Sequence, residues 1–245
     1  MNFVRLGVMW EGVERQPGVY DQTYLTAVDN LITRLGESGI YTLVDAHQDV
    51  FARVICGEGV PDFYAQELLS NGKGTSCLGP LDKLFRPAYN KMKVCRDMES
   101  YGYEKDENGD YIITDCQKNF FADYYTSTQS MYLFDALYNN YEGLQDKFVA
   151  FWDASSARLT HNPYVVGFDP LNEPYVGNWI KWPTLLQPGN FDRTRLAPMY
   201  SRVFEKYNKN DDQSLMWFEP ATFPDVMGYA GGIITSVGFD LPPGG

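Results

Sequence analysis

The first fifty residues alternate between short apolar runs and a segment with helical spacing. Residues 3–9 and 40–46 are β-branched-rich apolar runs, as buried parallel strands are. Between them, Asp21 is placed to cap a helix and Gly39 to end it. Apolar residues recur in this interval at the helical positions 24, 25, 28, 31, 32 and 35. The pattern predicts strand, helix, strand.

The same alternation returns after residue 143. We expect a helix from about Leu144, a strand over 164–169, a helix around 199–207 and a strand over 214–218. Such repeats predict parallel strands with right-handed crossovers, in a barrel or an open doubly wound sheet. An open sheet of this kind often carries a glycine-rich phosphate turn, and neither GxGxxG nor a Walker sequence occurs here. Polar residues at several strand ends favour the barrel.

Between residues 50 and 142 the periodicity is lost, over a stretch much longer than an ordinary βα loop. We treat 1–245 as one partial catalytic barrel and 50–142 as a long loop insertion within it. Its aromatic residues favour an ordered lid or cleft wall over disorder. With no CxxC pair and no Cys/His cluster, two disulfides of open connectivity are favoured over a zinc site, and four reduced thiols are the alternative. The cysteines are Cys56, Cys77, Cys95 and Cys116.

Charge and composition narrow the range of partners. A net charge of −12 and a pI near 4.6 disfavour nucleic acid. The sequence contains no run of eighteen apolar residues, so no transmembrane segment is predicted. The chain also starts without a signal-peptide pattern. Disulfides would make the parent protein secreted or lysosomal. The aromatic content of 16% suits stacking on sugar rings, although a large aromatic core explains it as well.

Two glutamates, Glu173 and Glu219, follow predicted strands. Glycoside cleavage needs one carboxylic acid to protonate the leaving oxygen, and a retaining enzyme needs a second carboxylate about 5 Å away. Asn172 adds an amide able to bond the sugar 2-hydroxyl. We therefore predict that Glu173 is the general acid/base. Alternatively, Glu173 starts a helix and only favours its positive N-terminus.

Six motifs spread along the chain resemble one known family. They are Asn-Phe-Val-Arg-Leu at 2–6, Trp-Glu-Gly at 10–12, Asp-Ala-His-Gln-Asp at 45–49, Gly-Glu-Gly-Val-Pro-Asp at 57–62, Asn-Glu-Pro at 172–174 and Phe-Glu-Pro-Ala at 218–221. Together they resemble glycoside hydrolase family 5, and the third and fourth point to its endoglycoceramidases and related glycosylceramidases. The resemblance implies an α/β fold of the (β/α)8 TIM-barrel type, no cofactor, and a glycosphingolipid or other β-glycoside as substrate.

The resemblance also implies roles for individual residues. Glu173 is then the acid/base, Asn172 holds the 2-hydroxyl, and His47 with Asp49 grips the sugar nearest the scissile bond. Arg5 supports the site from its strand end. Trp10 and Glu219 are further predicted substrate-site residues. Trp179 is predicted from its place in the loop after Glu173, where it would stack on sugar or on the lipid part of a substrate, and simple packing is the alternative.

The position of Glu219 bears on the missing partner of Glu173. The interval between the two holds one βα unit, since a barrel of about 250 residues allots roughly 31 to each. In the family, the acid/base ends strand four and the nucleophile ends strand seven. We therefore predict that Glu219 ends strand five, that the chain holds strands two to five, and that the nucleophile lies outside residues 1–245. The alternative is Glu219 as nucleophile.

A metal site and three functions complete the hypotheses. On a regular strand we expect Asp45 to point away from His47 and Asp49, and only one other histidine occurs, so we predict no metal. The favoured function is a retaining hydrolase that cuts between oligosaccharide, or glucose, and ceramide. The alternatives are another family 5 β-glucanase or lipid β-glucosidase, and a catalytically inactive fragment that binds glycolipid or carbohydrate.

Overall fold

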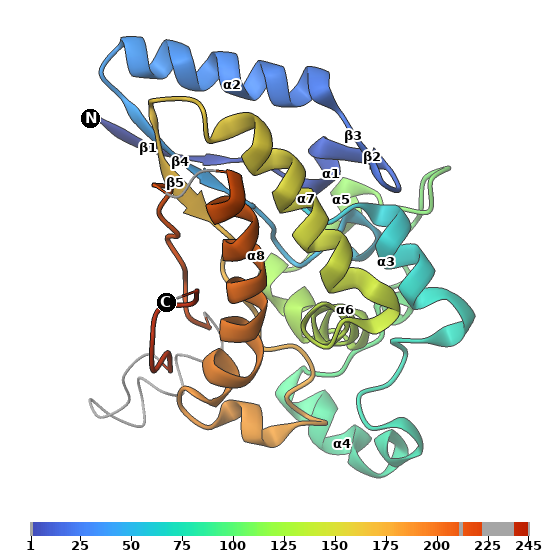
Figure 1. The fold of residues 1–245 in the computed structure, drawn as a ribbon. Helices are drawn as coiled ribbons and strands as arrows, with labels where there is room; N and C mark the ends of the chain where they lie inside the picture. The colour runs from blue at the N-terminus through green and yellow to red at the C-terminus, as the bar shows by residue number, and fades with distance from the viewer. Residues whose placement is uncertain (1, 211–212, 222–237, 245) are drawn as a thin grey trace.

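A small parallel sheet organises the computed structural model, which describes residues 2–210, 213–221 and 238–244. Its strands are β1 (Phe3–Gly7), β4 (Tyr41–Asp45) and β5 (Val165–Asp169), in the order β1-β4-β5 (Figure 1). Gly7 pairs with Asp45, and Asp45 pairs with Asp169. The carboxyl ends of the three strands therefore lie together at one edge.

The predicted strand over 214–218 is reduced to a single parallel bridge between Phe168 and Met216. Two backbone hydrogen bonds of 2.9 Å flank the bridge, from the Phe168 N–H to Leu215 and from the Trp217 N–H to Phe168. Gly167, at φ 149°, takes β5 out of regular strand geometry beside this bridge, which limits the ladder. The segment is still the next parallel neighbour of β5, so successive strands lie side by side as in a barrel.

Three long helices pack against this sheet and each other (Figure 1). They are α2 (Gln22–Glu37), α7 (Leu144–Leu159) and α8 (Ala197–Asn210). Trp152 of α7 packs against Phe168 and Tyr207, at ring-centroid distances of 5.8 and 5.0 Å. This contact joins β5 to two helices. Among the described residues, no helix is long and apolar enough to cross a membrane.

The capping residues predicted for α2 are confirmed. The Asp21 carboxylate accepts the N–H groups of Thr23 and Tyr24, both at 2.9 Å, and so satisfies two of the free donors of the first turn. Gly39 follows the helix at φ 79°, a conformation that favours glycine.

The expectation that residues 50–142 lack periodic structure is wrong for several stretches. The segment contains α3 (Asp62–Leu69), α4 (Asp82–Met92), α5 (Ile113–Cys116) and α6 (Thr128–Tyr138). Nearly all of α6 is buried, so it has no polar face and its sequence carries no amphipathic period. Short elements outside this segment are α1 (Trp10–Val13), β2 (Glu14–Gln16) and β3 (Val19–Tyr20), with short helical turns η7 (Pro183–Leu186) and η8 (Asp192–Leu196) before α8.

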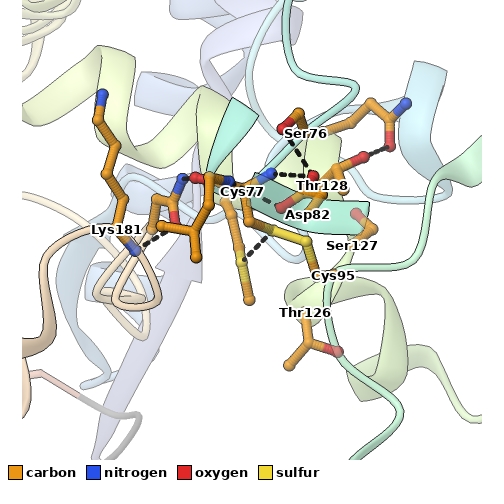
Figure 2. Close-up of a disulfide and its surroundings, with 12 residues drawn as sticks. Ser76, Cys77, Asp82, Cys95, Thr126, Ser127, Thr128 and Lys181 are labelled. Atoms are coloured by element: carbon orange, nitrogen blue, oxygen red, sulfur yellow. Dashed lines mark hydrogen bonds between the residues drawn. A yellow bond between two sulfur atoms is a disulfide. The ribbon is translucent and has the colours of Figure 1, made fainter. Parts of the chain in front are cut away.

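Both predicted disulfides are present, and the structure settles their connectivity. Cys56 pairs with Cys116, and Cys77 pairs with Cys95. The second bridge lies within the sequence interval closed by the first and joins the two flanks of α4 (Figure 2). Short helices in this segment are therefore held by covalent crosslinks as well as by packing.

Candidate active site

Arg5 lies at the centre of a polar cluster at the carboxyl ends of the strands. Its guanidinium donates to Asp169 Oδ2 from Nε at 3.0 Å and from Nη2 at 2.6 Å. It also donates to Asn172 Oδ1 at 2.7 Å and to Asp45 Oδ1 at 3.2 Å. A further ion pair joins it to Glu219. One cation thus ties together acidic and amide groups that come from three neighbouring segments.

The carboxylates around Arg5 are poorly solvated and crowd one another. Asp45 and Asp169 are 1% and 3% exposed. Burial, followed by the charges of Asp45 and Glu219, raises the pKa of Asp169 to about 8, although Arg5 opposes the shift. Burial also raises the pKa of Asp45. One guanidinium does not neutralise three carboxylates, and this crowding favours the protonated form of Asp169.

We predict that Asp169→Asn flattens the pH dependence of folding stability. An unfolded aspartate loses its proton near pH 4, whereas Asp169 in the folded protein holds its proton to about pH 8. Between these values the folded state binds more protons, so its stability falls as pH rises towards 8 and then levels off. The variant should lose part of that slope, at most the about 1.4 kcal/mol per pH unit that one proton contributes.

Urea unfolding between pH 5 and 9 measures this slope. Asp153→Asn is the control, because the Asp153 side chain is 36% exposed and pairs with Lys206 at 3.7 Å. Equal slopes for wild type and Asp169→Asn would contradict the prediction.

His47 bridges two aspartates in the same cluster. Its Nδ1 lies 2.9 Å from Asp45 Oδ2, and its Nε2 lies 3.5 Å from Asp49 Oδ2. The expectation that Asp45 points away from His47 and Asp49 is wrong, because residues i and i+2 of an extended chain lie on the same side. Asp45 therefore orients the His47 ring through Nδ1, and Asp49 lies beside Nε2.

The Gly-Glu-Gly run at 57–59 fits tightly against the end of β4. Asp49 and Glu58 exchange backbone hydrogen bonds of 3.0 and 2.7 Å. A Cβ at Gly57 would lie 2.3 Å from the Asp49 carbonyl oxygen, and one at Gly59 would lie 2.5 Å from the His47 carbonyl oxygen. Only glycine allows this approach, so the motif exists to hold the His47–Asp49 strand end in place.

Glu173 stands on a strained turn. Its φ of 43° is in the left-handed region, where a non-glycine residue is uncommon. The turn is fixed by the Asn172 N–H, which donates to Ala46 at 3.1 Å, and by Gln48 Nε2, which donates to the Asn172 carbonyl at 2.8 Å. Glu219 Oε2 accepts the Glu173 N–H at 3.3 Å. The Glu173 residue itself is exposed, as a group that meets substrate must be.

A cavity of about 530 Å³ adjoins this cluster on the Asp49 side. Acidic and aromatic residues share its wall with the Cys56–Cys116 disulfide, and they include Glu11, Asp49, Glu58, Tyr111, Phe121 and Tyr124. Its size suits a sugar unit or two, and flat rings with carboxylates are what sugar faces and hydroxyls bind.

The structure brings most predicted site residues together, and the two tryptophans differ in their surroundings. Trp10 is 2% exposed, and its indole N–H donates to Glu14 at 2.6 Å within the core. Trp10 thus packs in the core, and its predicted substrate contact stays a prediction. Trp179 is half-buried, with its indole N–H 3.0 Å from the Tyr175 hydroxyl.

Four residues of the site were missed by sequence reasoning. Asp45 and Asp169 end their strands, a position that could have singled them out. Gln48 clamps the Asn172 turn, and Tyr125 donates to Asp49 Oδ1 at 3.4 Å from far along the chain. No sequence signal identifies Tyr125.

One group of side chains has spacing suitable for a cation. Ligand atoms of His47, Asp49 and Glu58 lie within 4.8 Å of one another. This geometry would admit a divalent ion through one nitrogen and two oxygens. The same residues also serve as hydrogen-bonding groups for sugar hydroxyls, and the absence of a metal stays a prediction.

The chain is similar to several characterised proteins. The family model for cellulase (glycosyl hydrolase family 5) matches residues 1–76. Endoglycoceramidases of Hydra vulgaris and Cyanea nozakii are 33% and 30% identical over all 245 residues, and the chain spans 42% and 43% of their lengths. The structure of endo-glycoceramidase II from Rhodococcus sp. superposes with a TM-score of 0.63 at 25% sequence identity. The match covers 91% of this chain and 41% of the Rhodococcus chain.

Proposed function

We infer that this chain belongs to the endoglycoceramidase branch of glycoside hydrolase family 5, because its similarity to two endoglycoceramidases extends over all of its residues, and from that premise we propose that the protein containing it is a retaining glycosidase. Its substrate class is the glycosphingolipids, cut between the glycan, or a single glucose, and ceramide. The Asn172–Glu173 turn carries the proposal, because it presents an exposed carboxyl group beside a buried polar cluster at the strand ends.

In this mechanism Glu173 protonates the leaving oxygen and later deprotonates the attacking water. Arg5 holds the Asn172 oxygen, which leaves the amide N–H groups to Gln48 and to substrate. His47 and Asp49 bind the sugar at the scissile bond. Glu173 gives its proton to the leaving oxygen in the first step and regains one from the attacking water in the second, so the proton balance closes over one turnover.

Glu219 is a positioning residue in this proposal, and the nucleophile is a different carboxylate. The support is topological, because the 214–217 segment is the immediate neighbour of β5 and so corresponds to the next barrel strand. Glu219 also has a structural task, since it pairs with Arg5 and accepts the Glu173 N–H. We further propose a secretory or lysosomal location, which the two disulfides support.

The test is product analysis on the protein that carries residues 1–245, with the sequence encoded before and after them. A fluorescent glycosphingolipid should yield intact glycan and ceramide, and the first-formed glycan should keep the β configuration by NMR. Inverted product would exclude the retaining mechanism. Binding without turnover would favour the glycolipid-binding alternative, and hydrolysis of cellulose oligomers with none of glycosphingolipid would favour a β-glucanase.

A further inference from the structure

Helix α4 is set apart from the helices that pack on the sheet (Figure 1). Between residues 82 and 92 only Asp82 and Tyr89 are buried. The outward side carries an apolar stripe at helical spacing. The exposed members with their exposed fractions are Leu81 55%, Leu84 73%, Phe85 42% and Met92 54%, and the exposed Ala88 lies between them. We call these five residues the α4 stripe.

Basic residues flank the α4 stripe in an otherwise acidic chain. Residues 83–96 contain five of the chain's twenty lysines and arginines and no acidic residue, against a net charge of −12 overall. Lys83, Arg86, Lys91 and Lys93 make no ion pair within the part of the chain that the structure describes. The chain has 32 acidic residues elsewhere, so positive charge is concentrated at α4. This concentration favours an anionic binding partner.

Hydrogen bonds and a disulfide hold the chain on both sides of the helix (Figure 2). Asp82 accepts hydrogen bonds from the Ser76 hydroxyl at 2.6 Å and from the Cys77 and Leu78 N–H groups at 3.1 and 2.9 Å. Cys95 donates its N–H to Thr126 at 2.8 Å and is crosslinked to Cys77. The stripe is therefore presented in a fixed orientation, which lowers the entropic cost of docking.

A cavity of about 450 Å³ lies beside α4, and its lining holds three basic residues together with Asp97 and Asp123. Arg86 and Lys93 line it with Arg96, whose guanidinium lies 3.5 Å from the centroid of the Tyr101 ring. Asn119 lines both this cavity and the one beside Asp49. The cavity beside α4 therefore has one lining residue, Asn119, in common with the cavity that adjoins the candidate active site.

We propose that α4 docks the protein on an anionic lipid bilayer, with the stripe in the acyl-chain boundary and the basic residues at the headgroups. An apolar stripe flanked by lysine and arginine is the pattern of helices that lie in a membrane interface. Anionic headgroups are complementary in charge to the unpaired basic side chains. The helix is already folded and fixed, so it needs no folding on contact. Docking rests on the surface of α4 alone, and it would bring the proposed glycolipidase to its substrate.

Vesicle co-sedimentation tests docking without any turnover. The protein should bind phosphatidylcholine vesicles that contain phosphatidylserine, bind pure phosphatidylcholine vesicles weakly, and release as salt screens the charges. Each basic residue near an anionic surface contributes about fivefold to partitioning. Arg86→Glu with Lys93→Glu should therefore weaken binding at least about tenfold, and Leu84→Ser with Phe85→Ser should do the same by removing apolar contact.

The matched control is Leu31→Ser with Arg34→Glu on α2, because Leu31 is 42% exposed and Arg34 is also exposed. This variant should bind as wild type does, and thermal unfolding should show that all variants fold. Equal binding by the α4 variants, or none by the wild type, would overturn the proposal. The proposal would also be overturned, in favour of a polyanion site, if soluble dextran sulfate bound the wild type and the variant with Leu84→Ser and Phe85→Ser equally well. Failure of hydrolysis with docking intact would count only against the proposed activity.

Discussion

Glu173→Gln is expected to lower kcat/KM on a glycosphingolipid by about 10³-fold, within the range that general acid–base catalysis contributes. The amide keeps the size and polarity of the side chain but has no proton to give to the leaving oxygen. The backbone of the turn should be unchanged, because its hydrogen bonds involve Asn172, Gln48 and the Glu173 main chain rather than the side chain. Steady-state kinetics of both proteins measures the loss.

The leaving group provides the internal control for this variant. A 4-nitrophenyl glycoside releases a stable phenolate and needs little protonation, so its first step should be much less impaired by Glu173→Gln. Glu219→Gln is the matched comparison at the neighbouring strand end. If Glu219 only positions Arg5 and the turn, this variant keeps most of its activity. Complete loss with both substrates for Glu219→Gln would identify it as the nucleophile.

Arg5→Met is expected to destabilise the fold by about 3 kcal/mol, the lower end of the range for a broken buried pair. The lower end applies because the Arg5 side chain is 34% exposed. Asp45 and Asp169 remain buried and lose their cation, and Asn172 loses the donor that fixes its oxygen. Activity should fall with stability. Guanidinium unfolding gives the first quantity, and kcat/KM gives the second.

The stability loss on Arg5→Met should grow as pH rises above about 8. There Asp169 of the wild type ionises beside Arg5, whereas without Arg5 its pKa is higher still and the stability of the variant continues to fall. Arg15→Met is the control. Its side chain is 67% exposed and pairs with Asp21 at 3.6 Å, so the expected change is below about 1 kcal/mol. A similar small change for Arg5→Met would show that the cluster is not held by its charge.

Local patterns were enough to predict the elements around the sheet. Apolar periodicity located β1, α2, β4, α7, β5 and α8, because each buries one stripe or run against the same core. The motifs identified the family, which the relatives confirm over the whole chain. The helices of the segment 50–142 were not predicted, because they are short and because α6 is buried on nearly all sides.

The sequence by itself determined that Glu173 and His47 follow strand ends, and parallel strands place their carboxyl ends together. Arg5, expected at a strand end, lies in the middle of β1 and reaches the cluster through its long side chain. Only the tertiary structure decided that the pKa of Asp169 is raised, because that pKa depends on burial and on charges from other strands. It also moved Trp10 into the core, paired the cysteines, and left the α4 stripe uncovered. Contacts and exposure of this kind depend on residues distant in the chain, so no local pattern encodes them.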